Sequence, residues 1–119
     1  MPPAATIFHV TTRAQWEHAQ ATGTYRGDTL DTQGFIHCST AAQVAGVANA
    51  IFRGRQDLIL LRIDSTRVQP EIRYEPPTAP ENERFPHIYG PLNADAVLET
   101  LPFEPGPDGS FRLPKGVLR

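Results

Sequence analysis

Three histidines lie in short apolar segments and are the residues of this chain best suited to carry chemistry. They are His9 in Ile-Phe-His-Val-Thr, His37 in Phe-Ile-His-Cys-Ser-Thr and His87 in Phe-Pro-His-Ile-Tyr-Gly. Imidazole titrates nearest to neutral pH and serves as a general base, a general acid, a hydrogen-bond donor or a metal ligand. Most other polar residues fall in predicted turns or on solvated helix faces. We therefore predict a site built on these three histidines, with all three as catalytic candidates.

His37 ends a predicted apolar strand, directly before the hydroxyl groups of Ser39 and Thr40 and the start of a predicted helix. The amino terminus of a helix presents unpaired N–H groups and a partial positive charge of roughly half a unit, which favour a phosphate or a carboxylate. An anionic ligand is therefore expected here, with Ser39 and Thr40 among its contacts. The alternative is structural: Thr40 caps the helix, and His37 bonds a buried backbone group.

His9 and His87 each share a strand face with a residue that carries a hydroxyl group. Because side chains alternate along a strand, Thr11 projects with His9, and Tyr89 projects with His87 where that segment is extended. Both hydroxyls are candidate ligand contacts. The plainer alternatives are a core histidine with satisfied hydrogen bonds at position 9 and a structural turn at position 87.

Neither a metal site nor a cysteine nucleophile is favoured. Three imidazoles can bind zinc, but metal sites often show a close pair such as His-x-His or His-x-x-x-His, and this chain has none. Strand alternation turns Cys38 away from His37, as is typical of a small core residue. Glutamates gather near residues 71–83, where they are expected to be solvated, although Glu75 could reach a site from a strand end.

Length and composition are typical of a single small domain spanning residues 1–119. The chain has 11 Lys and Arg against 13 Asp and Glu, a formal charge of −2, which does not favour nucleic acid or an anionic membrane as a partner. Its single cysteine suits a reducing compartment. No apolar run approaches the roughly 20 residues that span a bilayer, and no signal peptide is recognised. We expect a cytoplasmic protein that binds a small molecule.

The first third of the chain predicts a strand, a helix and a loop. Residues 6–11 contain β-branched and aromatic apolar residues, which are typical of a buried strand. Thr12 and Gln15 form a capping-box pattern and Gly23 offers a left-handed stop, so a helix of about ten residues should lie between them. Residues 24–33 have no clear period and are predicted to be a connecting loop.

A second strand and helix follow. Residues 34–38 predict a strand, and Thr40 with Gln43 forms a second capping box. Apolar residues then recur at the spacing of a buried helix face: Val44, Val47, Ala48 and Ile51. Residues 58–63 are apolar at five of six positions, which predicts a central strand covered on both faces.

Strands and loops dominate the remainder. Residues 68–74 contain a proline and predict an edge strand, and residues 75–86 contain four prolines and predict a mobile loop. Residues 97–103 and 110–113 flank a Pro- and Gly-rich turn and predict a hairpin. Two long helices among more numerous strands favour an α+β fold. Phosphate-binding glycine loops are absent from the sequence.

Four motifs, in this order, resemble the bacterial domain-of-unknown-function 952 family. They are Phe-Ile-His-Cys-Ser-Thr at 35–40, Phe-Arg-Gly at 52–54, Leu-Leu-Arg-Ile-Asp at 60–64 and Phe-Pro-His-Ile-Tyr-Gly-Pro-Leu at 85–92. The likeness covers nearly the whole chain, although the family name carries no established activity. The resemblance implies an ADP-ribosyltransferase-like fold: an α+β protein with two helices and a split, mainly antiparallel sheet around an NAD-binding cleft.

The resemblance also implies roles for individual residues. The segment from Phe8 to Thr11 is similar to the first-strand histidine motif by which such transferases hold the nicotinamide ribose. His37 and Ser39 resemble part of the His-x-His-Leu-Ser segment of RNA 2′-phosphotransferases of the same fold, with Phe35 in place of the first histidine. The glutamate that polarises the ribose 2′-hydroxyl in many transferases has no clear match here, and His87 occupies the comparable late strand.

We therefore predict an uncharacterised protein with a histidine-lined cleft that binds a nucleotide-like anionic small molecule. NAD-dependent group transfer is the activity that the resemblance implies, with NAD as a cosubstrate and no other cofactor expected. Two alternatives stay open: a non-catalytic ligand-binding module, and an interaction protein whose histidines are structural.

Overall fold

A computed structural model of the chain describes residues 6–27, 29–75 and 84–113. Within these ranges the protein is a small α+β structure with three α-helices and eight strands. The helices are α1 (Arg13–Thr22), α2 (Leu30–Gln33) and α3 (Val44–Ile51). The strands are β1 (Thr6–Thr12), β2 (Thr24–Tyr25), β3 (Ile36–His37), β4 (Leu58–Asp64), β5 (Glu71–Glu75), β6 (Phe85–Tyr89), β7 (Leu92–Asn93) and β8 (Val97–Pro102). None of the described helices has the length and apolar character that crossing a membrane requires.

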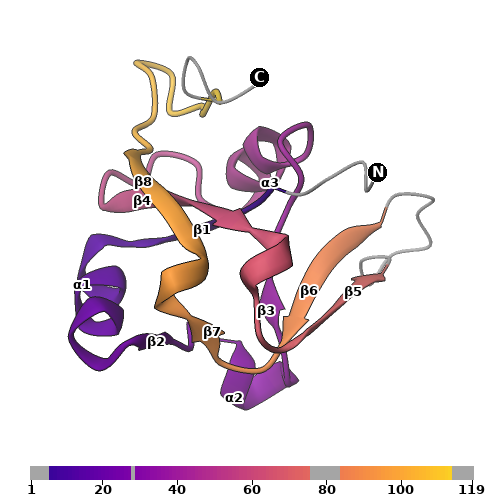
Figure 1. Cartoon of the computed structure of the whole chain (residues 1–119). Coiled ribbons are helices and arrows are strands. Elements are labelled where there is room, and N and C mark those ends of the chain that lie inside the picture. The colour runs from indigo at the N-terminus through magenta and orange to yellow at the C-terminus, as the bar shows by residue number, and fades with distance from the viewer. Residues whose placement is uncertain (1–5, 28, 76–83, 114–119) are drawn as a thin grey trace.

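The strands form two three-stranded sheets and one two-stranded sheet, and every pairing is antiparallel. The strand orders are β1-β4-β8, β3-β6-β5 and β2-β7. The first two sheets meet at a single bridge, between Phe8 of β1 and Ser39 just after β3. Figure 1 shows β3, β6 and β5 on one side of the molecule, with α1 on the opposite side and α3 above. The expected mainly antiparallel α+β arrangement is therefore present, with its strands in separate sheets.

Strand β4 is the centre of its sheet, as its apolar run predicted. Alternation sends Ile59, Leu61 and Ile63 into one buried cluster, which also contains Trp16 of α1. Leu58 and Leu60 enter a second cluster, together with residues of α3. Both faces of this sheet are thus covered, which explains why five of the seven residues of its central strand are apolar.

Helix α1 begins and ends where the local signals predicted. The hydroxyl of Thr12 accepts a hydrogen bond from the Gln15 N–H at 3.2 Å, and Gly23 is left-handed, with a φ of 85°. The N–H of Gly23 donates to the Ala19 carbonyl at 2.7 Å. These contacts satisfy N–H and C=O groups that a helix end leaves without partners.

Helix α3 differs from its prediction at both ends. It begins at Val44 rather than directly after Thr40, because residues 40–43 form a hydrogen-bonded turn. The capping box is half formed: the Thr40 N–H donates to the Gln43 side chain at 2.9 Å, but the hydroxyl of Thr40 does not cap the helix. Only part of the predicted apolar face is buried, since Ile51 is 67% exposed.

Two further predictions are wrong. Residues 24–33 contain β2 and the short helix α2, so the structure has three helices instead of two. Residues 110–113 form no strand, because the backbone of Phe111 is bound by a side chain instead: its N–H donates to Asn49 Oδ1 at 2.6 Å and its carbonyl accepts from Asn49 Nδ2 at 3.2 Å.

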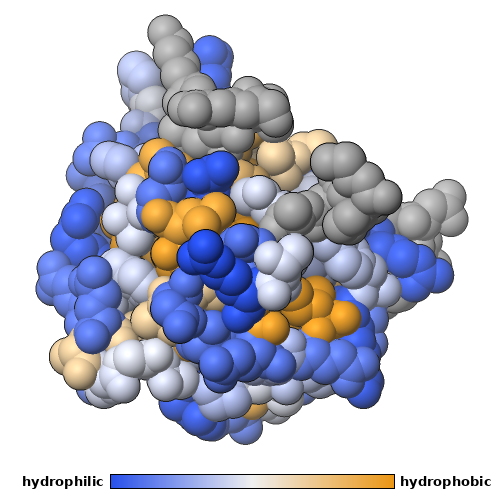
Figure 2. All heavy atoms as spheres, in the orientation of Figure 1, coloured by the Kyte–Doolittle hydropathy of each residue, from blue (hydrophilic) through white to orange (hydrophobic). Residues whose placement is uncertain are grey.

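The remaining predictions concern an edge strand and a loop. Strand β5 is an edge strand, as expected from its proline-containing lead-in. The loop predicted at 75–86 falls largely on residues 76–83, which lie outside the described residues. On the face shown in Figure 2, polar side chains surround small apolar patches.

Candidate functional site

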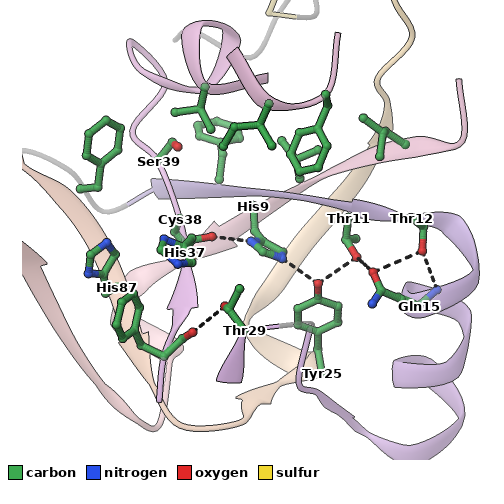
Figure 3. Close-up of a pocket in the computed structure, with 18 of the residues that line it drawn as sticks. His9, Thr11, Thr12, Gln15, Tyr25, Thr29, His37, Cys38, Ser39 and His87 are labelled. Carbon is green, nitrogen blue, oxygen red and sulfur yellow. Dashed lines mark hydrogen bonds between the residues drawn. The ribbon is translucent and has the colours of Figure 1, made fainter. Parts of the chain in front are cut away.

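A pocket of about 850 Å³ lies beside the Phe8–Ser39 bridge, and both bridged residues line it. His9, His37 and His87 all line it, so the three predicted histidines do converge on one hollow (Figure 3). One wall is polar and comes from β1, α1 and β2. A second wall is aromatic and comes from the segment around β3 and from β6. The third consists mainly of apolar side chains of α3 and the residues after it: Val47, Ile51, Phe52 and Leu58.

His9 begins a chain of hydrogen bonds along the polar wall. Its Nδ1 lies 2.5 Å from the backbone carbonyl oxygen of His37, and its Nε2 lies 2.6 Å from the hydroxyl of Tyr25. The hydroxyls of Tyr25 and Thr11 are 2.8 Å apart, and Thr11 lies 2.9 Å from Gln15 Oε1. Figure 3 shows these groups in a line from β3 to α1. The chain holds His9 by both ring nitrogens.

The proton content of His9 sets the direction of this chain. A carbonyl oxygen only accepts, so Nδ1 of His9 carries a hydrogen in either state. In the neutral ring Nε2 accepts from Tyr25. In the imidazolium Nε2 donates to Tyr25, which donates to Thr11, which donates to the oxygen of Gln15. Tyr25 and Thr11 are buried, at 2% and 4% exposure, so these bonds replace contacts with water.

The backbone of Val10 belongs to the edge of the β1-β4-β8 sheet beside the pocket. Phe8 exchanges both of its backbone hydrogen bonds with Ser39, at 2.7 and 2.8 Å. Along an antiparallel strand the backbone groups of alternate residues point to the same edge, so the N–H and carbonyl of Val10 also face away from β4. Val10 lines the pocket. This edge therefore offers one donor and one acceptor side by side.

His87 lies in the aromatic wall and is backed by a carboxylate. Its Nδ1 is 2.9 Å from Glu75 Oε1, which also accepts a hydrogen bond from the hydroxyl of Tyr89 at 2.5 Å. The ring of Phe35 stacks on the His87 ring, with the centroids 4.3 Å apart and an angle of 19°. His87 is buried, with 5% exposure, yet it borders the pocket.

His37 is exposed at the junction of the two walls. Its Nε2 lies 2.8 Å from Gln33 Oε1, and its ring meets that of His87 edge-on at 5.1 Å. Partial burial, and to a smaller extent the charge of the nearby His87, lower the pKa of His37 below its ordinary value. His37 is therefore a neutral imidazole at neutral pH, and the amide oxygen of Gln33 requires the hydrogen on Nε2.

The predicted ligand contacts divide into two groups. Thr11 and Ser39 line the pocket. Thr40 and Tyr89 lie outside its wall: Thr40 belongs to the turn before α3, and Tyr89 stands behind His87 on Glu75. Cys38 is packed in the core, and burial raises the pKa of its thiol far above the ordinary range. A protonated thiol is a poor nucleophile, in agreement with the core role predicted for it.

Charged groups are few in the pocket. Arg55 is the one Lys or Arg among the described lining residues, and its guanidinium pairs with the Asp57 carboxylate at 2.7 Å. No Asp or Glu is present among those lining residues. In the described part of the chain no three metal-binding side chains gather.

Several site residues escaped the sequence analysis. Tyr25 lies in a segment predicted to be a loop, and Gln15 was assigned only to a helix cap. Phe35 was noted only as standing in place of a histidine. The carbonyl of Phe35 accepts from the Thr29 hydroxyl at 2.7 Å, which ties this segment down. The one available signal was a tyrosine in a polar stretch. Tyr25 is buried in the structure, and a buried phenol needs a hydrogen-bond partner.

Comparison with known proteins identifies one family and solved structures that are similar to this chain. The family model described as "Protein of unknown function (DUF952)" matches residues 10–100. The crystal structure of protein CC0527 from Caulobacter crescentus is 31% identical, covers 91% of this chain and 94% of that chain, and has a TM-score of 0.80. A solution NMR structure of the same protein gives 31% identity, coverage of 92% and 94%, and a TM-score of 0.77. No curated protein matches the sequence.

Proposed function

Because the chain belongs to the DUF952 family of proteins of unknown function, we propose a function from the geometry of its pocket. The pocket binds a nucleotide-like anionic small molecule, and NAD is the candidate ligand. A volume of about 850 Å³ falls within the roughly 300–1,000 Å³ typical of ligand sites. The walls provide aromatic surface for a base and hydroxyl groups for a ribose.

The β1 edge is the observation that carries the proposal. The N–H and carbonyl of Val10 match a group that presents an acceptor and a donor side by side, such as a carboxamide or the edge of a nucleobase. His9 and Thr11, on the same strand, lie within reach of an adjacent sugar. The split antiparallel sheets and the resemblance to ADP-ribosyltransferase-like proteins support NAD over other nucleotides.

A titration followed by amide NMR tests this function. NAD, ADP-ribose, AMP and nicotinamide mononucleotide are added separately to the full-length protein. We expect the amide signals of Val10 and His37 to shift with saturation, while signals on the exposed face of α1, around His18, stay in place. If none of the four compounds causes a saturable shift at millimolar concentration, the proposal that the pocket binds a nucleotide-like molecule is wrong.

One observation favours the binding module over the enzyme. The carboxylate that polarises a ribose hydroxyl in the resembled transferases has no counterpart among the described lining residues, because Glu75 stands behind His87. Release of nicotinamide from NAD, followed by proton NMR, separates the two. Saturable binding without release indicates a module, and time-dependent release that requires His87 indicates group transfer.

A further inference from the structure

We propose that Glu75 is a positioning residue that fixes the tautomer of His87, so that this ring presents a hydrogen-bond acceptor to the pocket. The inference deepens the function proposed above and rests on it for the bound molecule, a ligand with a free hydroxyl group. Nε2 of His87 accepts a hydrogen bond from that hydroxyl, while the hydrogen on Nδ1 stays with the Glu75 contact.

The first argument is the tautomer of His87. Its Nδ1 lies 2.9 Å from Glu75 Oε1, and an ionised carboxylate only accepts hydrogen bonds. Nδ1 must therefore carry the hydrogen, which leaves the lone pair of the neutral ring on Nε2. No hydrogen bond to Nε2 is found among the described residues. The acceptor nitrogen is thus left for a group in the pocket.

The second argument is that Glu75 is itself held in the ionised state. The hydroxyl of Tyr89 donates to the same oxygen, and this bond, followed by that of His87, lowers the pKa of Glu75 below its ordinary value. The guanidinium of Arg73 lies over the Tyr89 ring, 4.5 Å from its centroid. Tyr89 and His87 thus bind the same oxygen of Glu75, so the carboxylate is held by a second group besides His87.

The third argument is the orientation of the ring. Phe35 stacks on one face of His87 at 4.3 Å, and His37 meets it edge-on at 5.1 Å. Rotation of the imidazole would break the Glu75 bond and disturb both contacts. An imidazole oriented by a second group keeps its acceptor nitrogen in one direction, an arrangement also found where a histidine acts as a general base.

Nitrogen NMR of the histidine rings in the unliganded full-length protein tests the proposal directly. At a pH where the ring is neutral, we expect His87 to show a protonated Nδ1 and an unprotonated Nε2. In Glu75→Ala, the Nε2–H form should rise to a substantial fraction, and in Tyr89→Phe it should rise less. The ring of His18, exposed on α1, is the internal reference. A wild-type His87 with Nε2–H, or an unchanged tautomer in Glu75→Ala, would overturn the proposal.

Chemical reactivity gives a second readout that does not depend on a ligand. Diethyl pyrocarbonate acylates the unprotonated ring nitrogen and can be mapped by mass spectrometry. We expect modification at His87 in the wild type and at least a twofold slower reaction in Glu75→Ala, with His18 unchanged. Equal rates at His87 in the two proteins would count against a positioning role. If the tautomer is as stated but none of the nucleotides binds, the proposed ligand fails and the positioning role stands.

Discussion

Nδ1 of His9 and the backbone carbonyl oxygen of His37 are 2.5 Å apart, although 28 residues separate them in the sequence. The contact joins β1 to β3 next to the Phe8–Ser39 bridge, and both histidines line the pocket. The two sheets are bridged by backbone hydrogen bonds only between Phe8 and Ser39 in the described residues. The His9 side chain adds a second connection between them. His9 therefore has a structural role in addition to the ligand contact proposed for it.

Replacing His9 tests the structural part of that role. In His9→Ala, the hydroxyl of Tyr25 and the carbonyl of His37 lose a partner, so we expect the free energy of unfolding to fall by about 1–3 kcal/mol. Urea denaturation measures the change. His18→Ala is the matched control, because that exposed histidine should cost no more than about 0.5 kcal/mol. Equal stability of the two variants would show that the contact adds nothing.

The hydroxyls of Tyr25 and Thr11 should be energetically coupled, since they are buried and 2.8 Å apart. We expect Tyr25→Phe to lower the free energy of unfolding by about 1–2 kcal/mol, because Thr11 is left with an unfilled hydrogen-bonding position. The double variant with Thr11→Val should cost less than the sum of the single changes by roughly 0.5 kcal/mol or more. Additive costs in this cycle would contradict the hydrogen-bond chain.

Stability should depend on pH through His37. Its pKa is lowered in the folded protein by partial burial and then by His87, so between that value and the ordinary 6.5 the unfolded chain binds more protons. Stability is therefore highest above 6.5 and falls as the pH drops through 6.5 toward the folded pKa. The pKa of Glu75 is also lowered, but its contribution is lost only below its ordinary value of 4.5.

The measurement is the urea midpoint between about pH 7.5 and about pH 5.5, compared with His37→Gln. The substituted protein should show a shallower decline, because it lacks the group that takes up the extra proton on unfolding. If the urea midpoint falls equally with pH in the two proteins, a group other than His37 causes the pH dependence.

Local signals account for the elements that the sequence analysis predicted correctly. The side chain of Thr12 caps the start of α1, and the left-handed backbone of Gly23 ends it. The apolar run of β4 is buried on both faces of its sheet. The convergence of the three histidines on one pocket was also predicted, from their position in apolar segments, although each had a structural alternative. None of these inferences required knowledge of a distant contact.

The errors arise where a distant contact decides the outcome. Tyr25 belongs to a two-residue strand, and its role in the site comes from a hydrogen bond to the ring of His9, 16 residues earlier. Val47 and Ile51 have the spacing of a buried helix face, but the pocket occupies the place where a covering layer would lie. Helical periodicity indicates which residues share a face, and only the tertiary structure determines what that face meets.

Asn49 should stabilise the segment that was predicted to be a strand. Its amide binds both the N–H and the carbonyl of Phe111, whose ring is buried against Phe103 at 4.9 Å. In Asn49→Ala, we expect a loss of about 1–2 kcal/mol and faster hydrogen exchange at the Phe111 amide. Asn49→Asp keeps the acceptor and should protect that amide more than alanine does. Wild-type exchange rates in Asn49→Ala would disprove the side-chain clamp.

Arg55 should contribute to the affinity for an anionic ligand. It lines the pocket and is paired with Asp57, whereas Arg53, two residues earlier, binds the Asp108 carbonyl away from it. We expect Arg55→Ala to weaken the binding of AMP or NAD about three- to tenfold, since a partly exposed charged contact is worth on the order of 1 kcal/mol. Arg53→Ala is the control of equal charge and should leave the affinity unchanged. Calorimetry at two salt concentrations checks the cause, because the Arg55 contribution should shrink at high salt. Equal losses in the two variants would indicate a general effect of net charge and exclude a specific contact at Arg55.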